Sequence, residues 1–226
     1  IANYNKENDG KLKIKIVRNE LDVDLLANKY LEVFENGAMQ NAPYRLVDFV
    51  SSPITILDKR LDEVLSKNVD RNLISKIGKF DFTFYFLKNT ISDDKVDGDR
   101  KKYPYKTFNS SNRKSWLKKF GGVKIFRDDF RIRPYGENGE DWLKLGARQA
   151  ESPGGAGQKL GGYRIRPNQI AGTINISRLF NESFQDKSGR EGLIENDVFE
   201  LFKNVIIEII SFFDNWLHPY YYYMMV

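Results

Sequence analysis

Residues 80–87 read Phe80-Asp81-Phe82-Thr83-Phe84-Tyr85-Phe86-Leu87, directly after the stretch that ends in Gly78-Lys79. Aromatic side chains occupy every second position, and aromatic residues are enriched in β-strands. Alternation of this kind is typical of a strand that buries one face. The stretch predicts the central strand of a sheet, and the rest of the chain can be arranged around it.

Five further stretches have strand character. Residues 11–16 alternate lysine with leucine or isoleucine, residues 52–57 begin with Ser52-Pro53, and residues 170–176 are rich in isoleucine. Residues 123–127 and 130–133 flank Asp128-Asp129, and two strands around so short an acidic turn predict a hairpin. By contrast, residues 1–10 are polar and are expected to be frayed.

Helical periodicity separates these strands. The predicted helices cover a segment from Asp22 or Asp24 to Glu35, residues 58–65, a segment from Ser110 or Ser111 to Phe120, residues 141–149 and residues 193–217. Residues 92–106 and 152–168 are expected to be exposed loops, because they offer few apolar side chains. Strands and helices are mixed along the chain, with hairpin-type neighbours. The predicted class is therefore α+β, with a mixed sheet packed on helices and a long C-terminal helix.

Composition excludes several kinds of site. The 226 residues include no cysteine and one histidine, so neither a disulfide framework nor a thiolate or multi-histidine metal site is available. We expect His218, the single histidine, to be a helix-end cation or a surface residue. The net charge of +5 is only mildly basic. There is no secretory signal pattern and no long apolar run, so a soluble, cytoplasmic protein is expected, with no membrane partner.

Two motifs allow alternative interpretations. The glycines of residues 154–162 match neither a Walker loop nor a dinucleotide loop, and predict a flexible segment instead. The cations on the predicted hairpin and on the predicted loop of residues 152–168 are expected to face solvent. The alternative is one basic surface for nucleic acid, with Tyr135 and Tyr163 stacking on bases; its cations would be Lys124, Arg127, Arg131, Arg133, Lys159, Arg164 and Arg166.

Two segments together resemble a known family. Residues 122–136 read GVKIFRDDFRIRPYG and are followed by Asp141-Trp142-Leu143 and Arg148, and residues 187–196 read KSGREGLIEN. This combination resembles the second, transducer domain of the GHKL ATPases, which include the ninety-kilodalton heat-shock chaperones. It is closest to MORC-like bacterial ATP-binding proteins, in which an asparagine stands at the position of Gly189. The resemblance covers residues 78–215.

The resemblance implies a ribosomal-protein-like transducer fold and a site around residue 190. Arg190 falls on the catalytic arginine that reaches the γ-phosphate of ATP in that family. Ser188 and Gly189 would lie beside the nucleotide, and Arg148 is a second residue expected to contact it. No metal ligand is implied in this chain, because the family binds ATP and Mg²⁺ mainly in a separate N-terminal domain. Neither the magnesium helix nor the adenine loop of that domain occurs in these 226 residues.

The implied organisation has three parts. Residues 1–77 would join the chain to the ATP-binding domain, residues 78–217 would form the transducer core, and residues 218–226 would be a tail. The partner would be the N-terminal ATP-binding domain in cis, with homodimerisation and nucleic-acid binding as further possibilities. The isolated chain would not hydrolyse ATP. Two alternatives stay open, a module that binds nucleic acid without catalysis and a dimerisation module.

Overall fold

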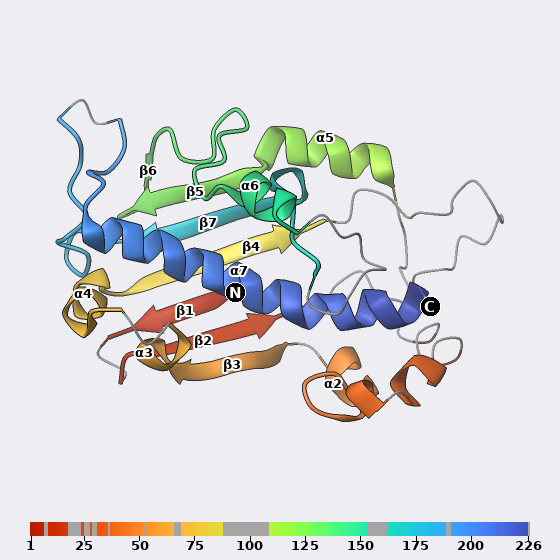
Figure 1. Ribbon diagram of the computed structural model, residues 1–226. Coiled ribbons are helices and arrows are strands. Elements are labelled where there is room, and N and C mark those ends of the chain that lie inside the picture. Colours follow the sequence, from red (N-terminus) through yellow and green to blue (C-terminus); the bar gives the residue numbers. More distant parts are fainter. Residues whose placement is uncertain are drawn as a thin grey trace.

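A seven-stranded mixed sheet forms the centre of the computed structural model (Figure 1). The strand order is β3-β2-β1-β4-β7-β5-β6. Every neighbouring pair is antiparallel except β5 and β7, which run parallel. The strands are β1 (Ala2–Asn5), β2 (Lys11–Ile16), β3 (Ile54–Arg60), β4 (Phe80–Phe86), β5 (Gly122–Arg127), β6 (Phe130–Ile132) and β7 (Ile170–Ile176).

The structure describes residues 1–6, 9–17, 24, 28, 31–35, 37–51, 53–65, 69–87, 109–152, 162–188 and 191–225. The α-helices are α2 (Leu46–Val50), α3 (Leu61–Val64), α4 (Arg71–Ile77), α5 (Ser110–Phe120), α6 (Leu145–Ala150) and α7 (Asp197–Met225). The described residues also include three short 3₁₀ helices, η1 (Leu31–Glu35), η2 (Gly37–Gln40) and η3 (Pro167–Gln169). The predicted loop over residues 92–106 and most of the glycine-rich segment lie outside the described residues.

The long helix α7 crosses one face of the sheet (Figure 1). The alternating aromatic side chains of β4 meet it: the Phe80 and Phe202 ring centroids are 5.2 Å apart, and those of Phe84 and Phe213 are 5.3 Å apart. Phe202 is fully buried, and burial of such a side chain contributes roughly 1.5–3 kcal/mol. The predicted α+β class, with a mixed sheet and a long C-terminal helix, is confirmed.

The other face of the sheet is polar. Side chains alternate along a strand, so the lysines of β2 and residues Asp81, Thr83 and Tyr85 of β4 point away from α7. Asn3 donates to Asp81 across this face at 2.6 Å, and Lys13 pairs with Asp58 at 3.4 Å. The sheet thus has one face packed on helices and one polar face.

The first residues of the chain are not frayed, contrary to the prediction. β1 lies between β2 and β4, and its side chains Ala2 and Tyr4 are buried in the core. Polar residues at alternate positions let β1 present one side to the core and the other to the polar face. The predicted helix start at Asp58 is also wrong. β3 pairs with β2 as far as Arg60, and α3 starts only at Leu61.

The C-terminal helix begins later and ends later than predicted. Leu193 pairs with Asp186 instead of opening the helix, and α7 starts at Asp197 after Asn196, whose side-chain oxygen accepts from the Phe199 amide at 2.9 Å. An asparagine cap of this kind satisfies an amide that has no partner within the helix. His218 lies inside α7 and is fully buried, so its prediction as a surface residue is wrong.

Two glycines of the predicted hairpin region let the backbone approach itself closely. Gly122 and Gly136 both have positive φ, at 84° and 67°. A Cβ atom on Gly136 would lie 2.4 Å from the Val123 carbonyl oxygen. Between them, Asp128 and Asp129 also have positive φ, which fits the predicted tight turn. The glycines therefore fold residues 133–136 back against the start of β5.

We expect Gly136→Ala to destabilise the protein by at least about 2 kcal/mol, because a Cβ at this position overlaps backbone and the φ favours glycine. Gly139→Ala is the matched control: Gly139 also has positive φ, at 85°, but a Cβ there would meet nothing within 4 Å. Urea unfolding of both variants measures the difference. An equal decrease in the free energy of unfolding in the two variants would show that the close approach of residue 136 to the Val123 backbone does not affect stability.

The described helices include none that combines the length and the apolar character needed to cross a membrane.

Candidate functional site

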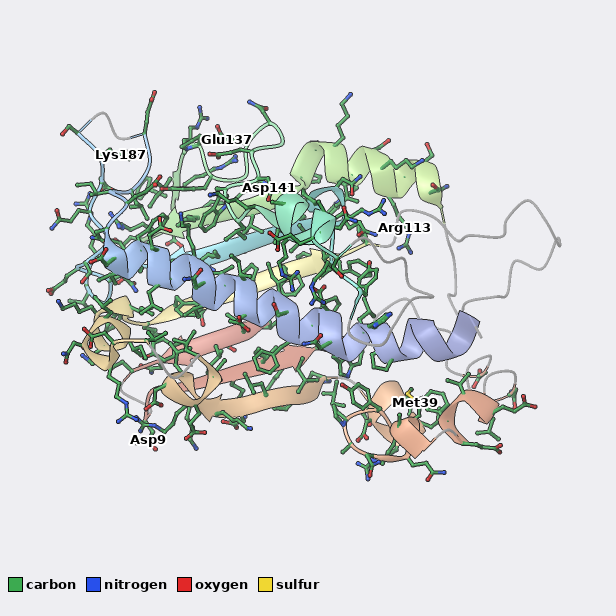
Figure 2. All side chains as sticks on the ribbon, in the orientation of Figure 1. Asp9, Met39, Arg113, Glu137, Asp141 and Lys187 are labelled. Carbon is green, nitrogen blue, oxygen red and sulfur yellow. The ribbon has the colours of Figure 1, made fainter. Side chains whose placement is uncertain are left out.

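A hairpin loop lies at one end of the sheet and precedes α7 in the sequence. The Ile194 amide donates to the Gln185 carbonyl at 2.8 Å, the Lys187 amide donates to the Gly192 carbonyl at 3.0 Å, and Asp186 and Leu193 form the bridge between them. We call residues 185–194 the finger loop. Figure 2 shows its Lys187 projecting beyond the sheet. Its paired stem fixes the two ends of the short segment 188–191.

Arg127 anchors one side of the finger loop. Its guanidinium, at the end of β5, donates from Nη1 to Asp186 Oδ1 at 2.7 Å and from Nη2 to the Phe184 carbonyl. The side chain is only 7% exposed, and charge-assisted hydrogen bonds at such a site are strong. Arg127 was a candidate for the alternative basic surface. That assignment is wrong, because its positive charge is buried against the loop.

Tyr135 anchors the other side. Its hydroxyl oxygen accepts from the Leu193 amide at 3.0 Å, and its ring packs on Trp142 and Phe199. Burial raises the pKa of Tyr135 above its usual value of 10, so the hydroxyl stays protonated at neutral pH. Because Tyr135 is 5% exposed, it cannot stack on a nucleic-acid base as the alternative interpretation required.

We expect Tyr135→Phe to loosen the finger loop without unfolding the protein. The ring still fills its place, but the buried Leu193 amide loses its acceptor, which costs about 1–3 kcal/mol. Hydrogen exchange at Leu193 should then be about tenfold faster, since local opening becomes easier. An unchanged Leu193 exchange rate, with a stable fold, would show that the hydroxyl does not hold the loop.

The predicted site residues divide between two places. Ser188 is exposed in the finger loop, while Gly189 and Arg190 lie outside the described residues. Arg148 lies on α6 and contacts α7 at Asp214, roughly 25 Å along the helix from its first residue at 1.5 Å per residue. The structure therefore does not bring Arg148 to the finger loop.

Arg148 belongs to a polar cluster inside the protein. Its Nη1 donates to Asp214 Oδ2 at 2.6 Å, and its Nη2 donates to Ser211 Oγ at 2.7 Å. The other carboxylate oxygen, Oδ1 of Asp214, accepts from the Ile165 amide at 3.1 Å. Burial raises the pKa of Asp214 to about 6, although Arg148 opposes the shift. This cluster ties α6 and residue 165, on either side of the glycine-rich segment, to α7.

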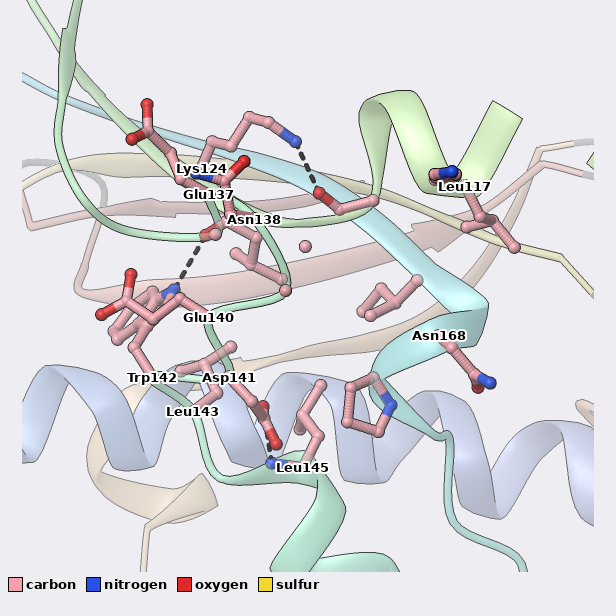
Figure 3. Close-up of a pocket in the computed structure, with 18 of the residues that line it drawn as sticks. Leu117, Lys124, Glu137, Asn138, Glu140, Asp141, Trp142, Leu143, Leu145 and Asn168 are labelled. Carbon is pink, nitrogen blue, oxygen red and sulfur yellow. Dashed lines mark hydrogen bonds between the residues drawn. The ribbon is translucent and has the colours of Figure 1, made fainter. Parts of the chain in front are cut away.

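A groove with a volume of about 1010 Å³ opens beside the first half of β5 (Figure 3). Its walls are α5, η3 and the segment from Gly136 to Leu145. Trp142 Nε1 donates to the Val123 carbonyl at 2.8 Å and closes the strand edge. Lys124 Nζ donates to the carbonyls of Phe120 and Gly121, at 2.6 and 2.8 Å, and so caps the end of α5.

Three of the charged side chains that line the groove form ion pairs with one another. Glu137 forms ion pairs with both Arg131 and Arg133, each at 3.2 Å, which offsets part of the positive charge that the alternative basic surface would need. Burial raises the pKa of Glu140 and lowers that of Lys124. No group of acidic or histidine side chains that could hold a metal ion occurs in the part of the chain that the structure describes. Sequence reasoning missed this groove: residues of the first motif line it, but nothing in that motif indicates that they face α5 and η3.

Neither a protein-family model, nor a curated protein, nor a solved structure gives a significant match to the chain.

Proposed function

We propose that this chain is the transducer domain of a GHKL-type ATPase, with a ribosomal-protein-like fold. In this proposal, Arg190 reaches the γ-phosphate of ATP that a separate N-terminal domain holds with Mg²⁺. The chain would supply one catalytic group and relay the nucleotide state, and would not hydrolyse ATP by itself.

One observation carries the proposal: the two sequence segments of the resemblance meet in space. The segment 122–136 supplies Arg127 and Tyr135, and these two side chains hold both strands of the finger loop that contains Arg190. Gly122 and Gly136 allow the fold that places Tyr135 there. The residues of the first segment thus have a physical reason to occur together with those of the second.

The chemistry requires an arginine on a positioned loop. A guanidinium carries a fixed charge and a planar set of donors that match phosphate oxygens. Placed on the γ-phosphate, it stabilises charge in the transition state, and arginine fingers contribute roughly 10³–10⁵ in rate. A paired stem with buried anchors lowers the entropy lost when the tip docks, since most of the loop is already ordered.

The finger loop is also placed to transmit the nucleotide state. It leads into α7 through the Asn196 cap, and Asn196 Nδ2 donates to the Ser183 carbonyl at 2.9 Å. A displacement of the loop would therefore act on the start of the helix that covers the sheet. Docking of Arg190 on ATP would move α7 relative to β4 and β7.

Hydrogen exchange in the complete protein tests the proposal. With a non-hydrolysable ATP analogue, residues 185–194 should gain protection that ADP does not give, because only the analogue offers a γ-phosphate to Arg190. Residues 54–60 in β3 serve as the internal control and should not change. If ATP analogue and ADP protect the finger loop equally, the loop does not sense the γ-phosphate.

A further inference from the structure

The groove beside β5 is lined by more positive than negative side chains. Six of the lining residues are lysine or arginine and three are aspartate or glutamate, so the lining has a net charge of +3. The cations come from α5, from β5 and from the segment that begins with β6. They are Lys114, Lys118, Lys119, Lys124, Arg131 and Arg133. Like charges gathered in a concave site attract an anion, because the walls of the site concentrate their field.

Each of the three lining carboxylates has a partner on its own wall of the groove. Glu137 forms its ion pairs with the two lining arginines. Asp141 accepts from the first two amides of α6, at 2.9 and 2.7 Å, and Glu140 accepts a hydrogen bond from the Gly136 backbone. Figure 3 shows the Asp141 carboxylate directed toward Leu145 and away from Lys124. The negative charges of the lining are therefore engaged within residues 131–146.

The lysines of α5, on the opposite wall, have no such partners. Lys114 and Lys118 are four residues apart, so they lie on the same side of the helix, and both are exposed. Among the residues that the structure describes, neither has an ion-pair partner. Lys118 lies in the last turn of α5 and complements the negative end of the helix dipole. Lys114 lies one turn earlier, where this effect has faded, so its position is left without a structural reason.

Lys124 of β5 adds a third ammonium group to the groove. Its Nζ donates to the carbonyls that end α5, which uses two of its three donors. Burial lowers the pKa of Lys124, and the positive charge of Arg131 lowers it further, although Glu137 opposes the shift. Both causes disfavour the positive charge of Lys124. An anion bound in the groove would offset that cost.

We infer that the groove binds a small molecule that carries two or more phosphate groups. Lysine binds phosphate as a point charge, and Lys114, Lys118 and Lys124 present three such charges from a helix and a strand of the sheet. The groove volume of about 1010 Å³ lies at the upper end of the range for small-molecule sites, roughly 300–1,000 Å³. Inorganic polyphosphate and nucleoside polyphosphates both carry this chemistry.

Two observations favour a small phosphorylated molecule over a macromolecule. Trp142 donates to the Val123 carbonyl, so an extended peptide cannot pair with the edge of β5 there. Trp142 is also the one aromatic residue in the described lining, and its ring stacks on Phe199 at 6.1 Å between centroids. The bases of a single-stranded nucleic acid would therefore find no free aromatic platform in the groove.

The inference does not rest on the proposed ATPase function, because no residue of the finger loop lines the groove. It also differs from the basic surface considered in the sequence. Arg127 is buried against the finger loop and does not contribute, and the lysines of α5 supply charge that the sequence did not connect with β5.

Isothermal titration calorimetry of the 226-residue chain with inorganic tripolyphosphate tests the inference, at low ionic strength where screening is weak. We expect saturable binding of one tripolyphosphate per chain. Replacing Lys114 and Lys118 together by glutamine should weaken binding at least about tenfold, because two charged donors are lost. The matched control replaces Lys11 and Lys59, which are exposed on β2 and β3, and should change the affinity less than about twofold.

Asn138→Asp places a negative charge in the groove without removing a cation. Asn138 is exposed, lines the wall opposite α5 and has a φ of 49°, which aspartate adopts about as readily as asparagine. The variant should therefore fold normally and bind tripolyphosphate several-fold more weakly. This result would separate a loss of charge attraction from a folding defect in the lysine variant. Unchanged affinity in Asn138→Asp would place the anion outside the groove and overturn the inference.

A parallel titration with UTP distinguishes the two sources of phosphate. Tighter binding of UTP than of tripolyphosphate would identify a nucleotide, and equal or weaker binding would identify inorganic polyphosphate; both results support the inference. Arg190→Ala should leave the affinity for tripolyphosphate unchanged, whatever its effect on ATP turnover in the complete protein. Loss of binding in that variant would place the phosphates at the finger loop instead.

Four further results would overturn the inference. They are no binding of tripolyphosphate or UTP, binding of citrate as tight as that of tripolyphosphate, equal losses in the lysine variant and its control, and tighter binding of a single-stranded oligonucleotide of about 16 nucleotides than of either small anion. Citrate tests for a general preference for anions, and the oligonucleotide tests for a nucleic-acid site.

Discussion

Arg190→Ala in the complete protein should lower ATP turnover by about two orders of magnitude or more, while nucleotide affinity changes only several-fold. A guanidinium that acts on the γ-phosphate mainly in the transition state affects turnover more than ground-state binding. Arginine fingers contribute roughly 10³–10⁵ in rate, so a loss of about 10² is the minimum that we expect. Single-turnover hydrolysis beside nucleotide binding measures the two quantities separately.

Lys187→Ala is the matched control for this variant. Lys187 is an exposed cation in the same stem, and its ion pair with Glu195 is long, at 3.9 Å between side chains that are half exposed. Its removal should leave turnover nearly unchanged. Arg190→Lys should restore only part of the activity, because lysine lacks the planar donor set. Near-normal turnover in Arg190→Ala, with an intact fold, would refute the assignment of the catalytic arginine.

Arg148→Met should destabilise the protein by about 3 kcal/mol or more. The substitution leaves the fully buried Asp214 carboxylate without its guanidinium partner, and breaking a buried pair on one side typically costs about 3–5 kcal/mol. Arg71→Met is the matched control, because Arg71 is 86% exposed and 4.0 Å from Asp62, and it should cost less than about 0.5 kcal/mol. Urea unfolding at pH 7 compares the two.

The pH dependence of the stability loss in Arg148→Met identifies the Asp214 carboxyl as the cause of that loss. Burial raises the pKa of this carboxyl from 3.8 to about 6, so the folded state binds its proton more tightly than the unfolded state. The contribution of the Asp214 carboxyl to the free energy of unfolding therefore falls as pH rises from about 4 to 6. Without Arg148 the pKa rises further, so Arg148→Met should be less destabilising at pH 5 than at pH 7.

The double variant Arg148→Met with Asp214→Asn should regain most of the lost stability, because no buried charge remains and the asparagine oxygen can still accept from the Ile165 amide. A single variant that loses the same stability at both pH values, with no recovery in the double variant, would contradict a buried unpaired carboxylate. In that case the loss would come from packing alone. The cluster would then have no electrostatic role in holding α6 against α7.

Strand positions were predictable wherever side chains alternate between apolar and polar. The alternation of residues 11–16 and 80–86 reflects a sheet with one buried and one polar face, and β2 and β4 follow it. The hairpin around Asp128 and the strand from Ile170 to Ile176 were also predicted correctly, because turn chemistry and β-branched runs are local signals.

Features that depend on distant partners were not predictable. Residues 2–5 become a central strand only because β2 and β4 lie on both sides of them. The helix start moved from Leu193 to Asp197 because Leu193 pairs with Asp186 and with the Tyr135 hydroxyl. Arg127 looked like a solvated cation, and only the fold shows that it faces Asp186, which is 59 positions away.

The candidate functional site was also predictable only in part, because its contacts join residues that are far apart in the sequence. Two separate motifs indicated that residues 122–136 and 187–196 matter together, but the sequence contained no sign that Arg127 and Tyr135 hold the second segment. Arg148 was expected beside the nucleotide because it follows Asp141-Trp142-Leu143. Its partner Asp214 is 66 positions further along the chain, and no local pattern connects the two.

We propose that the tip of the finger loop approaches the γ-phosphate of ATP. The chain has no cysteine, so Ser188→Cys introduces a single thiol next to Gly189 and Arg190. In the complete protein with no other cysteine, an ATP analogue with a thiol-reactive group on its γ-phosphate should label position 188. Ser115→Cys, exposed on α5, should stay unlabelled. Labelling of 188 above 115 that excess ATP abolishes is the predicted result; equal labelling of both positions, or none at 188, would contradict the claim.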